Sequence, residues 1–147
     1  YPDVEVIAGV ATGAIAQGAL VADALGLPFV YVRSSAKDHG MKNLVEGYLE
    51  EGKKVVVVED LISTGGSSLK AVAALREEKQ ANVLGMVAIF TYQFPLAQEQ
   101  FAAANVELTT LSNYNALVEA AAEINYIDES VVPTLQEWRK DPANWQK

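Results

Sequence analysis

Two acidic residues and a loop of small residues follow the most apolar run of the sequence. Glu59 and Asp60 come directly after four valines, Val55 to Val58, and residues 63–68 then read STGGSS. A continuous apolar run is typical of a strand covered on both faces, as in a parallel sheet, and open α/β sheets bind ligands at the carboxyl ends of their strands. Because successive side chains point to opposite faces of a strand, we expect the two carboxylates to have different tasks.

The loop after the acids has the composition of a phosphate site. A helix predicted to begin near Ser67 would direct its free N–H groups and the positive end of its dipole at a ligand above the strand. Gly65 and Gly66 allow the backbone to approach a ligand closely. Four side chains add hydroxyl donors: Ser63, Thr64, Ser67 and Ser68. With carboxylates to accept hydrogen bonds from vicinal hydroxyls, the pattern favours a phosphorylated sugar.

The loop has three other possible interpretations. It contains neither the GxxxxGK[ST] lysine of nucleotide triphosphatases nor the GxGxxG of dinucleotide-binding folds, so both are disfavoured. The third interpretation is purely structural: the loop only turns the chain and caps a helix, and the acids only solvate the end of a strand.

A second group of chemically capable side chains lies in residues 33–40, RSSAKDHG. It holds Arg33, Lys37 and His39, the single histidine of a chain with a net charge of −8. Cations on a loop can close over a polyanion and stabilise charge on a departing group. The alternative is a solvated loop that carries an incidental histidine.

The surrounding pattern predicts the elements that position these groups. Strands are expected at residues 4–9, 28–32, 45–49, 53–60, 82–92 and 106–111. Helices are expected at residues 19–26, 67–79, 95–104, 113–123 and 130–140, and residues 9–18 are expected to form a turn of small residues. Strands that alternate with helices predict an α/β fold, a doubly wound and mostly parallel sheet flanked by helices. We expect residues 1–147 to form a single domain.

Composition narrows the class of protein further. The negative net charge disfavours nucleic-acid binding, and the lack of cysteine excludes disulfides and thiolate zinc sites. No apolar run reaches the roughly 18 residues of a membrane span, and nothing reads as a signal peptide. The expectation is a protein of the cytoplasm without a membrane or nucleic-acid partner.

The stretch VVVVEDLISTGGSS resembles the phosphoribosyl pyrophosphate signature of the type I phosphoribosyltransferases. The resemblance implies that residues 63–67 bind the 5′-phosphate of this substrate, and that Glu59 and Asp60 engage its ribose hydroxyls. Residues 9–33 are similar to the pyrophosphate-loop segment of the same family.

Residues 33–40 resemble the catalytic loop of the orotate branch, R-x-x-x-K-x-H-G, with Arg33, Lys37 and His39 in place. This resemblance implies that orotate displaces pyrophosphate from C1 of the ribose to give orotidine 5′-monophosphate. Lys37, His39 and Asp60 are then the expected catalytic residues, and Arg33 binds substrate. A Mg²⁺ ion on the diphosphate is implied, and so is a homodimer in which loop 33–40 enters the neighbouring site.

The resemblance also implies that the base is read partly elsewhere. Tyr92 lies where relatives contact the base, and relatives carry an additional N-terminal hood that the 147 residues lack. Three alternatives stay open: a phosphoribosyltransferase for another base or a regulator of that family, a core that binds phosphoribosyl pyrophosphate without turnover, and a flavodoxin-like domain in which Asp60 binds a metal. The last would predict a second acidic cluster after the first strand, where the sequence reads GVATG.

Overall fold

The computed structural model of the chain describes residues 1–35 and 43–145. Its strands are β1 (Val6–Val10), β2 (Phe29–Val32), β3 (Val45–Glu46), β4 (Lys54–Ile62), β5 (Asn82–Thr91) and β6 (Leu108–Asn113). Its helices are α1 (Ala14–Leu25), α2 (Gly66–Lys79), α3 (Pro95–Ala103), α4 (Tyr114–Glu123) and α5 (Val132–Lys140), with 3₁₀ turns at Glu129–Val131 and Pro142–Asn144. No helix in these described ranges combines the length and the apolar character needed to cross a bilayer.

All six strands form one sheet in the order β3-β2-β1-β4-β5-β6. Every neighbouring pair is parallel except β2 and β3, which are antiparallel. The chain builds the sheet in one direction from β1 to β2 and in the other direction from β4 onward. Strand order therefore reverses between β1 and β4, and in open α/β sheets the ligand crevice lies outside the carboxyl ends of such a pair. The predicted fold class is confirmed.

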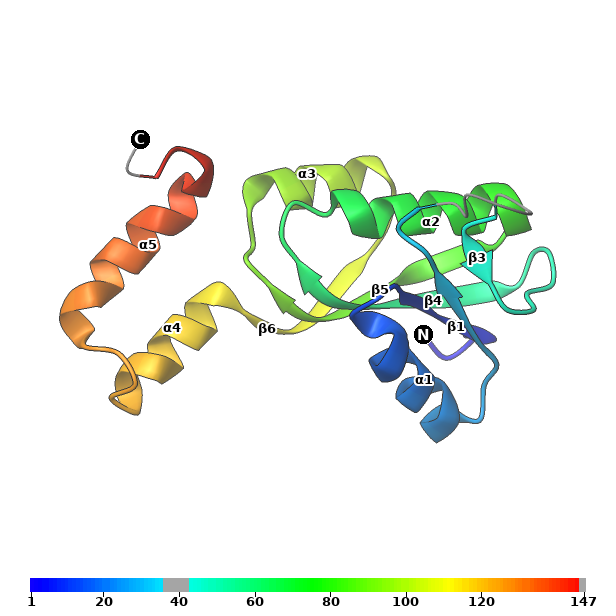
Figure 1. The fold of residues 1–147 in the computed structure, drawn as a ribbon, viewed down its shortest axis with the longest axis horizontal. Coiled ribbons are helices and arrows are strands. Elements are labelled where there is room, and N and C mark those ends of the chain that lie inside the picture. The colour runs from blue at the N-terminus through cyan, green and yellow to red at the C-terminus, as the bar shows by residue number, and fades with distance from the viewer. Residues whose placement is uncertain (36–42, 146–147) are drawn as a thin grey trace.

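Side chains of β4 alternate between two hydrophobic cores. Val55 and Val57 belong to a core that contains Leu75 of α2 and Phe101 of α3, whereas Val56 and Val58 pack in a second core. That second core includes Ala14 and Ala22 of α1. Helices α2 and α3 thus cover one face of the sheet and α1 lies on the other (Figure 1). This arrangement explains why the four valines read as a continuous apolar run.

Helix α1 begins earlier than the sequence predicts. It starts at Ala14, and Gly18, which we expected in a turn, lies buried within the helix. A Cβ atom at Gly18 would lie 2.8 Å from a ring carbon of Phe29 and 3.2 Å from the Cα of Gly9. Gly18 therefore lets α1 pack closely on the sheet and does not mark a turn. The expected strand at residues 45–49 is reduced to the two residues of β3.

The C-terminal hairpin of α4 and α5 lies apart from the sheet (Figure 1). Four aromatic rings join it to the end of β5: Tyr92, Phe94, Tyr114 and Trp138. The centroids of contacting rings lie 5.3 to 6.3 Å apart. The Arg139 guanidinium also donates hydrogen bonds to the carbonyls of Tyr92 and Gln93, at 3.2 and 2.8 Å. We call these four rings with Arg139 the hairpin anchor.

Candidate functional site

The carboxyl ends of β1 and β4 bring two loops together. After β1 the chain passes through residues 11–13 into α1, and the peptide bond between Ala11 and Thr12 is cis. After β4 it passes through residues 63–65 into α2. Because β1 and β4 pair along their length, these two helix-opening turns lie beside each other at the crevice. The sequence prediction that the acids stand at the ligand-binding end of the sheet is consistent with this position.

Asp60 lies against the turn that follows β1. It is partly exposed, and its Oδ1 accepts a hydrogen bond of 2.7 Å from the N–H of Leu61. A Cβ atom at Gly13 would overlap the carboxylate of Asp60, so only glycine at position 13 leaves room for it. The carboxylate of Asp60 therefore adjoins the crevice and retains lone pairs for donors of a ligand.

Glu59 has the opposite environment. Its side chain is 4% exposed, its Oε2 accepts a 2.8 Å hydrogen bond from the Ser68 hydroxyl, and its Oε1 accepts one of 3.0 Å from the Asp60 N–H. Burial raises the pKa of Glu59 to about 7. The charge of Asp60 adds to this rise, whereas the hydrogen bonds from the Ser68 hydroxyl and the Asp60 N–H oppose it. The two acids thus differ in exposure and partners, as the alternation of the strand predicts.

One expected member of the phosphate loop is wrongly assigned. We expected the Ser68 hydroxyl to face a ligand, but Ser68 is 1% exposed and donates inward to Glu59. The cause is the helical phase of α2, which turns Ser67 outward and the next residue toward the sheet. Ser63 is partly exposed, and Thr64 and Ser67 are exposed. These three hydroxyls remain available to a ligand.

The two glycines of the loop have different functions. Gly65 is the N-cap of α2 with φ 86°, in the left-handed region, and no side chain caps this helix. A Cβ atom at Gly65 would also lie 2.8 Å from a ring carbon of Phe101. Gly66 has nothing within 4 Å of its Cβ position. The first N–H groups of α2 therefore open toward the crevice without a capping side chain, which is the arrangement that binds anions at helix N-termini.

Gly65→Ala is expected to lower the free energy of unfolding by about 1–3 kcal/mol, because alanine must adopt a left-handed conformation and displace Phe101. Gly66→Ala is the matched control and is expected to leave stability unchanged or slightly raised, since alanine favours the helix that begins there. Urea unfolding of both variants makes the comparison. Equal stabilities of the two would contradict a conformational requirement at position 65.

Arg33 follows the end of β2 and borders a cavity together with the first turn of α2. It forms an ion pair of 3.4 Å with Glu46 and borders a cavity of about 380 Å³ that Ser67 and Lys70 also line. A second cavity, of about 300 Å³, lies between Arg33, Thr12 and Ser34. Lys70 and Thr12 were not singled out from the sequence. The one available signal was the position of Lys70, one helical turn beyond Ser67.

Lys37 and His39 lie outside the described residues, but the chain on either side of them is fixed. The N–H of Arg33 donates to the carbonyl of Leu44 at 2.9 Å. The carboxylate of Glu78 on α2 accepts hydrogen bonds from the N–H groups of Leu44 and Val45, at 2.9 to 3.2 Å. The segment that carries both expected catalytic residues therefore begins and ends beside α2.

Tyr92 belongs to the hairpin anchor. Its ring stacks on Phe94 with an interplanar angle of 5° and meets the edges of Phe90 and Trp138. This packing gives Tyr92 a structural task, and its contact with a base stays a prediction.

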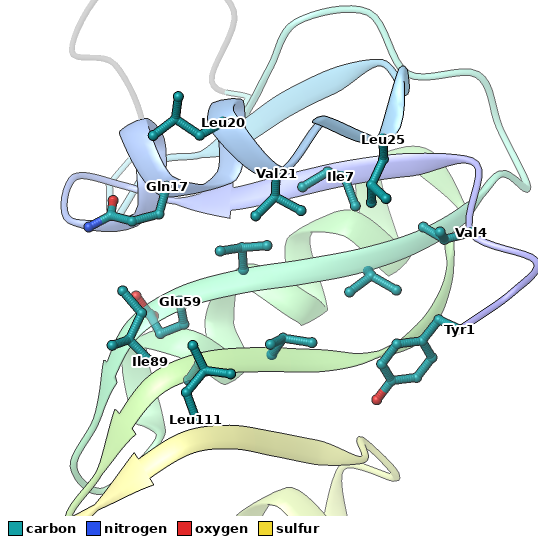
Figure 2. Close-up of a pocket in the computed structure, with 14 residues that line it drawn as sticks. Tyr1, Val4, Ile7, Gln17, Leu20, Val21, Leu25, Glu59, Ile89 and Leu111 are labelled. Atoms are coloured by element: carbon teal, nitrogen blue, oxygen red, sulfur yellow. The ribbon is translucent and has the colours of Figure 1, made fainter. Parts of the chain in front are cut away.

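An apolar groove of about 520 Å³ lies on the α1 face of the sheet. Figure 2 shows Leu20, Val21 and Leu25 of α1 on one wall, Ile89 and Leu111 on the other, and Tyr1 at one end. Glu59 and Gln17 are at the other end (Figure 2). Its apolar lining excludes this groove as the phosphate site.

The described part of the chain contains no group of three or more His, Cys, Asp and Glu side chains arranged to hold a metal ion.

The N-terminus of α2 without a capping side chain, the carboxylate of Asp60 and the guanidinium of Arg33 all lie near the carboxyl ends of the central strands. The family model described as "Phosphoribosyl transferase domain" matches residues 2–106, so the chain is a phosphoribosyltransferase. The chain is 62% identical over 146 residues to an orotate phosphoribosyltransferase of Bacteroides fragilis, and 57% identical over 147 residues to one of Enterococcus faecalis. These alignments cover 99% and 100% of the chain and 68% and 70% of the relatives. The chain belongs to the orotate phosphoribosyltransferase family.

Solved structures agree with this assignment. The crystal structure of orotate phosphoribosyltransferase from Aeropyrum pernix matches 84% of the chain with a TM-score of 0.73 and 30% identity, and the match covers 67% of that protein. An adenine phosphoribosyltransferase from Thermoanaerobacter pseudethanolicus matches 76% of the chain and 70% of its own length, with a TM-score of 0.63. Because its identity is 24%, it supports the fold alone.

Proposed function

We propose that the chain transfers the 5-phosphoribosyl group of phosphoribosyl pyrophosphate to orotate, giving orotidine 5′-monophosphate and pyrophosphate in pyrimidine biosynthesis. The observation that carries the proposal is the crevice at the switch point, where Asp60 adjoins the turn after β1 and the open N-terminus of α2 lies beside it. The high identity to orotate phosphoribosyltransferases supports orotate over another base.

The reaction breaks the bond from C1 of the ribose to the pyrophosphate oxygen and forms a bond from C1 to a ring nitrogen of orotate. The loop of residues 63–67 holds the 5′-phosphate through N–H groups and hydroxyls. Asp60 accepts hydrogen bonds from ribose hydroxyls while positive charge develops on the ribose ring. Glu59, whose side chain points to the opposite face of β4, helps to stabilise this charge. Arg33, Lys37 and His39 stabilise the departing pyrophosphate, and Tyr92 contacts the base.

A Mg²⁺ ion completes this proposal. The crevice around Arg33 offers oxygen donors such as the hydroxyls of Thr12 and Ser34, and oxygen donors suit a hard cation that a diphosphate chelates. When bound, Mg²⁺ neutralises charge on the leaving pyrophosphate.

A homodimer in the cytoplasm is the expected form of the enzyme. In such a dimer, loop 33–40 of one subunit enters the site of the other.

The proposal is tested by pyrophosphate release from phosphoribosyl pyrophosphate with orotate, and with uracil and adenine as control bases. The chain is assayed with Mg²⁺ beside the whole Bacteroides fragilis relative, which reports that the assay works. Release that depends on orotate alone is expected. Equal release with uracil or adenine would contradict the assigned base, and binding of phosphoribosyl pyrophosphate without release would contradict the assigned activity.

A further inference from the structure

The Ser68 hydroxyl is a buried contact between helix α2 and strand β4. Ser68 lies in the first turn of α2 and is 1% exposed, whereas Ser67 beside it is exposed. Its Oγ donates to Oε2 of Glu59 at 2.8 Å. A hydroxyl in this position is closed to a ligand, so any effect it has on the site passes through Glu59.

We propose that Ser68 is a positioning residue, whose hydroxyl fixes the Glu59 carboxylate against the first turn of α2 and so joins the acidic pair to the phosphate-binding loop. The effect of Ser68 on catalysis rests on the proposed function. The hydrogen bond by which Ser68 orients Glu59 is present without substrate, and it can be tested on the chain alone.

The geometry gives Glu59 one orientation. The N–H of Asp60 occupies Oε1 and the Ser68 hydroxyl occupies Oε2, so each oxygen is held from a different element. Without Ser68, Oε2 would be a buried acceptor that has lost its partner, and such an atom is costly. The carboxylate would then rotate or take up a proton. Either change acts on Asp60, whose backbone N–H is the other partner.

Protonation is the measurable consequence. Burial raises the pKa of Glu59 to about 7 and the Ser68 hydrogen bond lowers it, because that bond favours the charged form. Among the described residues, the ionisable group that acts on Glu59 is Asp60, whose charge raises the pKa further. The residues of α1 and β5 that share the groove with Glu59 at this end, Gln17, Ala88 and Ile89, carry no ionisable group.

The direct experiment is a carbon-13 NMR titration of the Glu59 carboxyl in the chain alone, with Ser68→Ala beside Ser67→Ala. Ser68→Ala is expected to move the midpoint upward by about one pH unit or more, the effect of losing one hydrogen bond to a charged group. Ser67→Ala is expected to leave the midpoint unchanged, because its hydroxyl does not contact Glu59. Ser68→Thr, which keeps the hydroxyl, is expected to return it toward the original value.

A second measurement follows the affinity for phosphoribosyl pyrophosphate against pH by calorimetry. Acidification is expected to weaken the affinity once Glu59 takes up a proton. In Ser68→Ala this loss should begin at a higher pH, and the shift should equal the shift of the Glu59 midpoint. If Ser68→Ala does not fold, Ser68→Cys, which is nearly isosteric and a weak donor, replaces it in both measurements.

An unchanged Glu59 midpoint in Ser68→Ala would overturn the positioning role. The same holds for a shift of equal size in Ser67→Ala. Failure of the proposed function would look different, since the original chain would then release no pyrophosphate with orotate while the two titrations still differed.

Discussion

Asp60→Asn is expected to weaken the binding of phosphoribosyl pyrophosphate by roughly 10- to 100-fold. This is the range for removing the charge from an acceptor of two hydroxyl hydrogen bonds, since bonds to charged groups are stronger than those to neutral ones. Asparagine keeps the size of the side chain, so it can lie against Gly13 as aspartate does. The loss therefore reports on charge and not on packing. Calorimetry at pH 8 with Mg²⁺ measures it.

Asp23→Asn is the matched control for this variant. It removes the same charge from an exposed position near the C-terminal end of α1, and the N-terminus of that helix is the end that faces the crevice. Its affinity is expected to equal that of the original chain. Equal affinities of the Asp60 and Asp23 variants would contradict the assignment of Asp60 to the ribose.

Glu59→Gln is expected to stabilise the fold in alkaline solution while it lowers activity. The folded pKa of Glu59 is about 7, above the ordinary 4.5, so between these values the folded chain binds more protons than the unfolded chain. The free energy of unfolding therefore falls as the pH rises through this window and levels off above pH 7. Across this window the ionisation of Glu59 lowers the free energy of unfolding by about 3 kcal/mol at most. Glutamine does not ionise, and that part of the pH dependence should disappear.

Urea unfolding at pH 5, 6, 7 and 8 tests this prediction, with Glu51→Gln as the control because Glu51 is exposed. Relative to the original chain, Glu59→Gln should gain stability from pH 5 to about pH 7 and little more at pH 8, and Glu51→Gln should not. In the same preparations kcat/KM with orotate should fall at least about tenfold in the Glu59 variant, because a neutral amide supports the developing charge less well. Parallel stability curves for all three proteins would contradict the raised pKa.

The sequence was sufficient to predict the order of strands and helices and to place the two acids and the glycine loop after the central strand. Four consecutive valines identify a strand buried on both faces, and Glu59 and Asp60, directly after them, lie near the carboxyl end of β4 as predicted. Their opposite exposure also follows from the period of a strand alone.

The inward hydroxyl of Ser68 and the early start of α1 were not predictable in the same way. Both depend on how a helix is rotated and packed against the sheet, and the local sequence pattern does not predict this. Ser67 and Ser68 are the same type of residue, and only the rotation of α2 about its axis gives them different environments. Gly18 reads as a turn residue until the ring of Phe29 is seen against it. The contact of Glu78 with Leu44 spans 34 positions and has no local signature.

The hairpin anchor has a consequence for how the chain comes apart. No residue of α4 or α5 belongs to either hydrophobic core of the sheet, so the hairpin depends on the aromatic rings and on Arg139. Parts of a protein with few buried apolar contacts open at lower free energy than the whole. The indole of Trp138, packed among three other rings, will change its fluorescence when the hairpin detaches. The chain thus carries its own optical reporter of a partial opening that leaves the sheet intact.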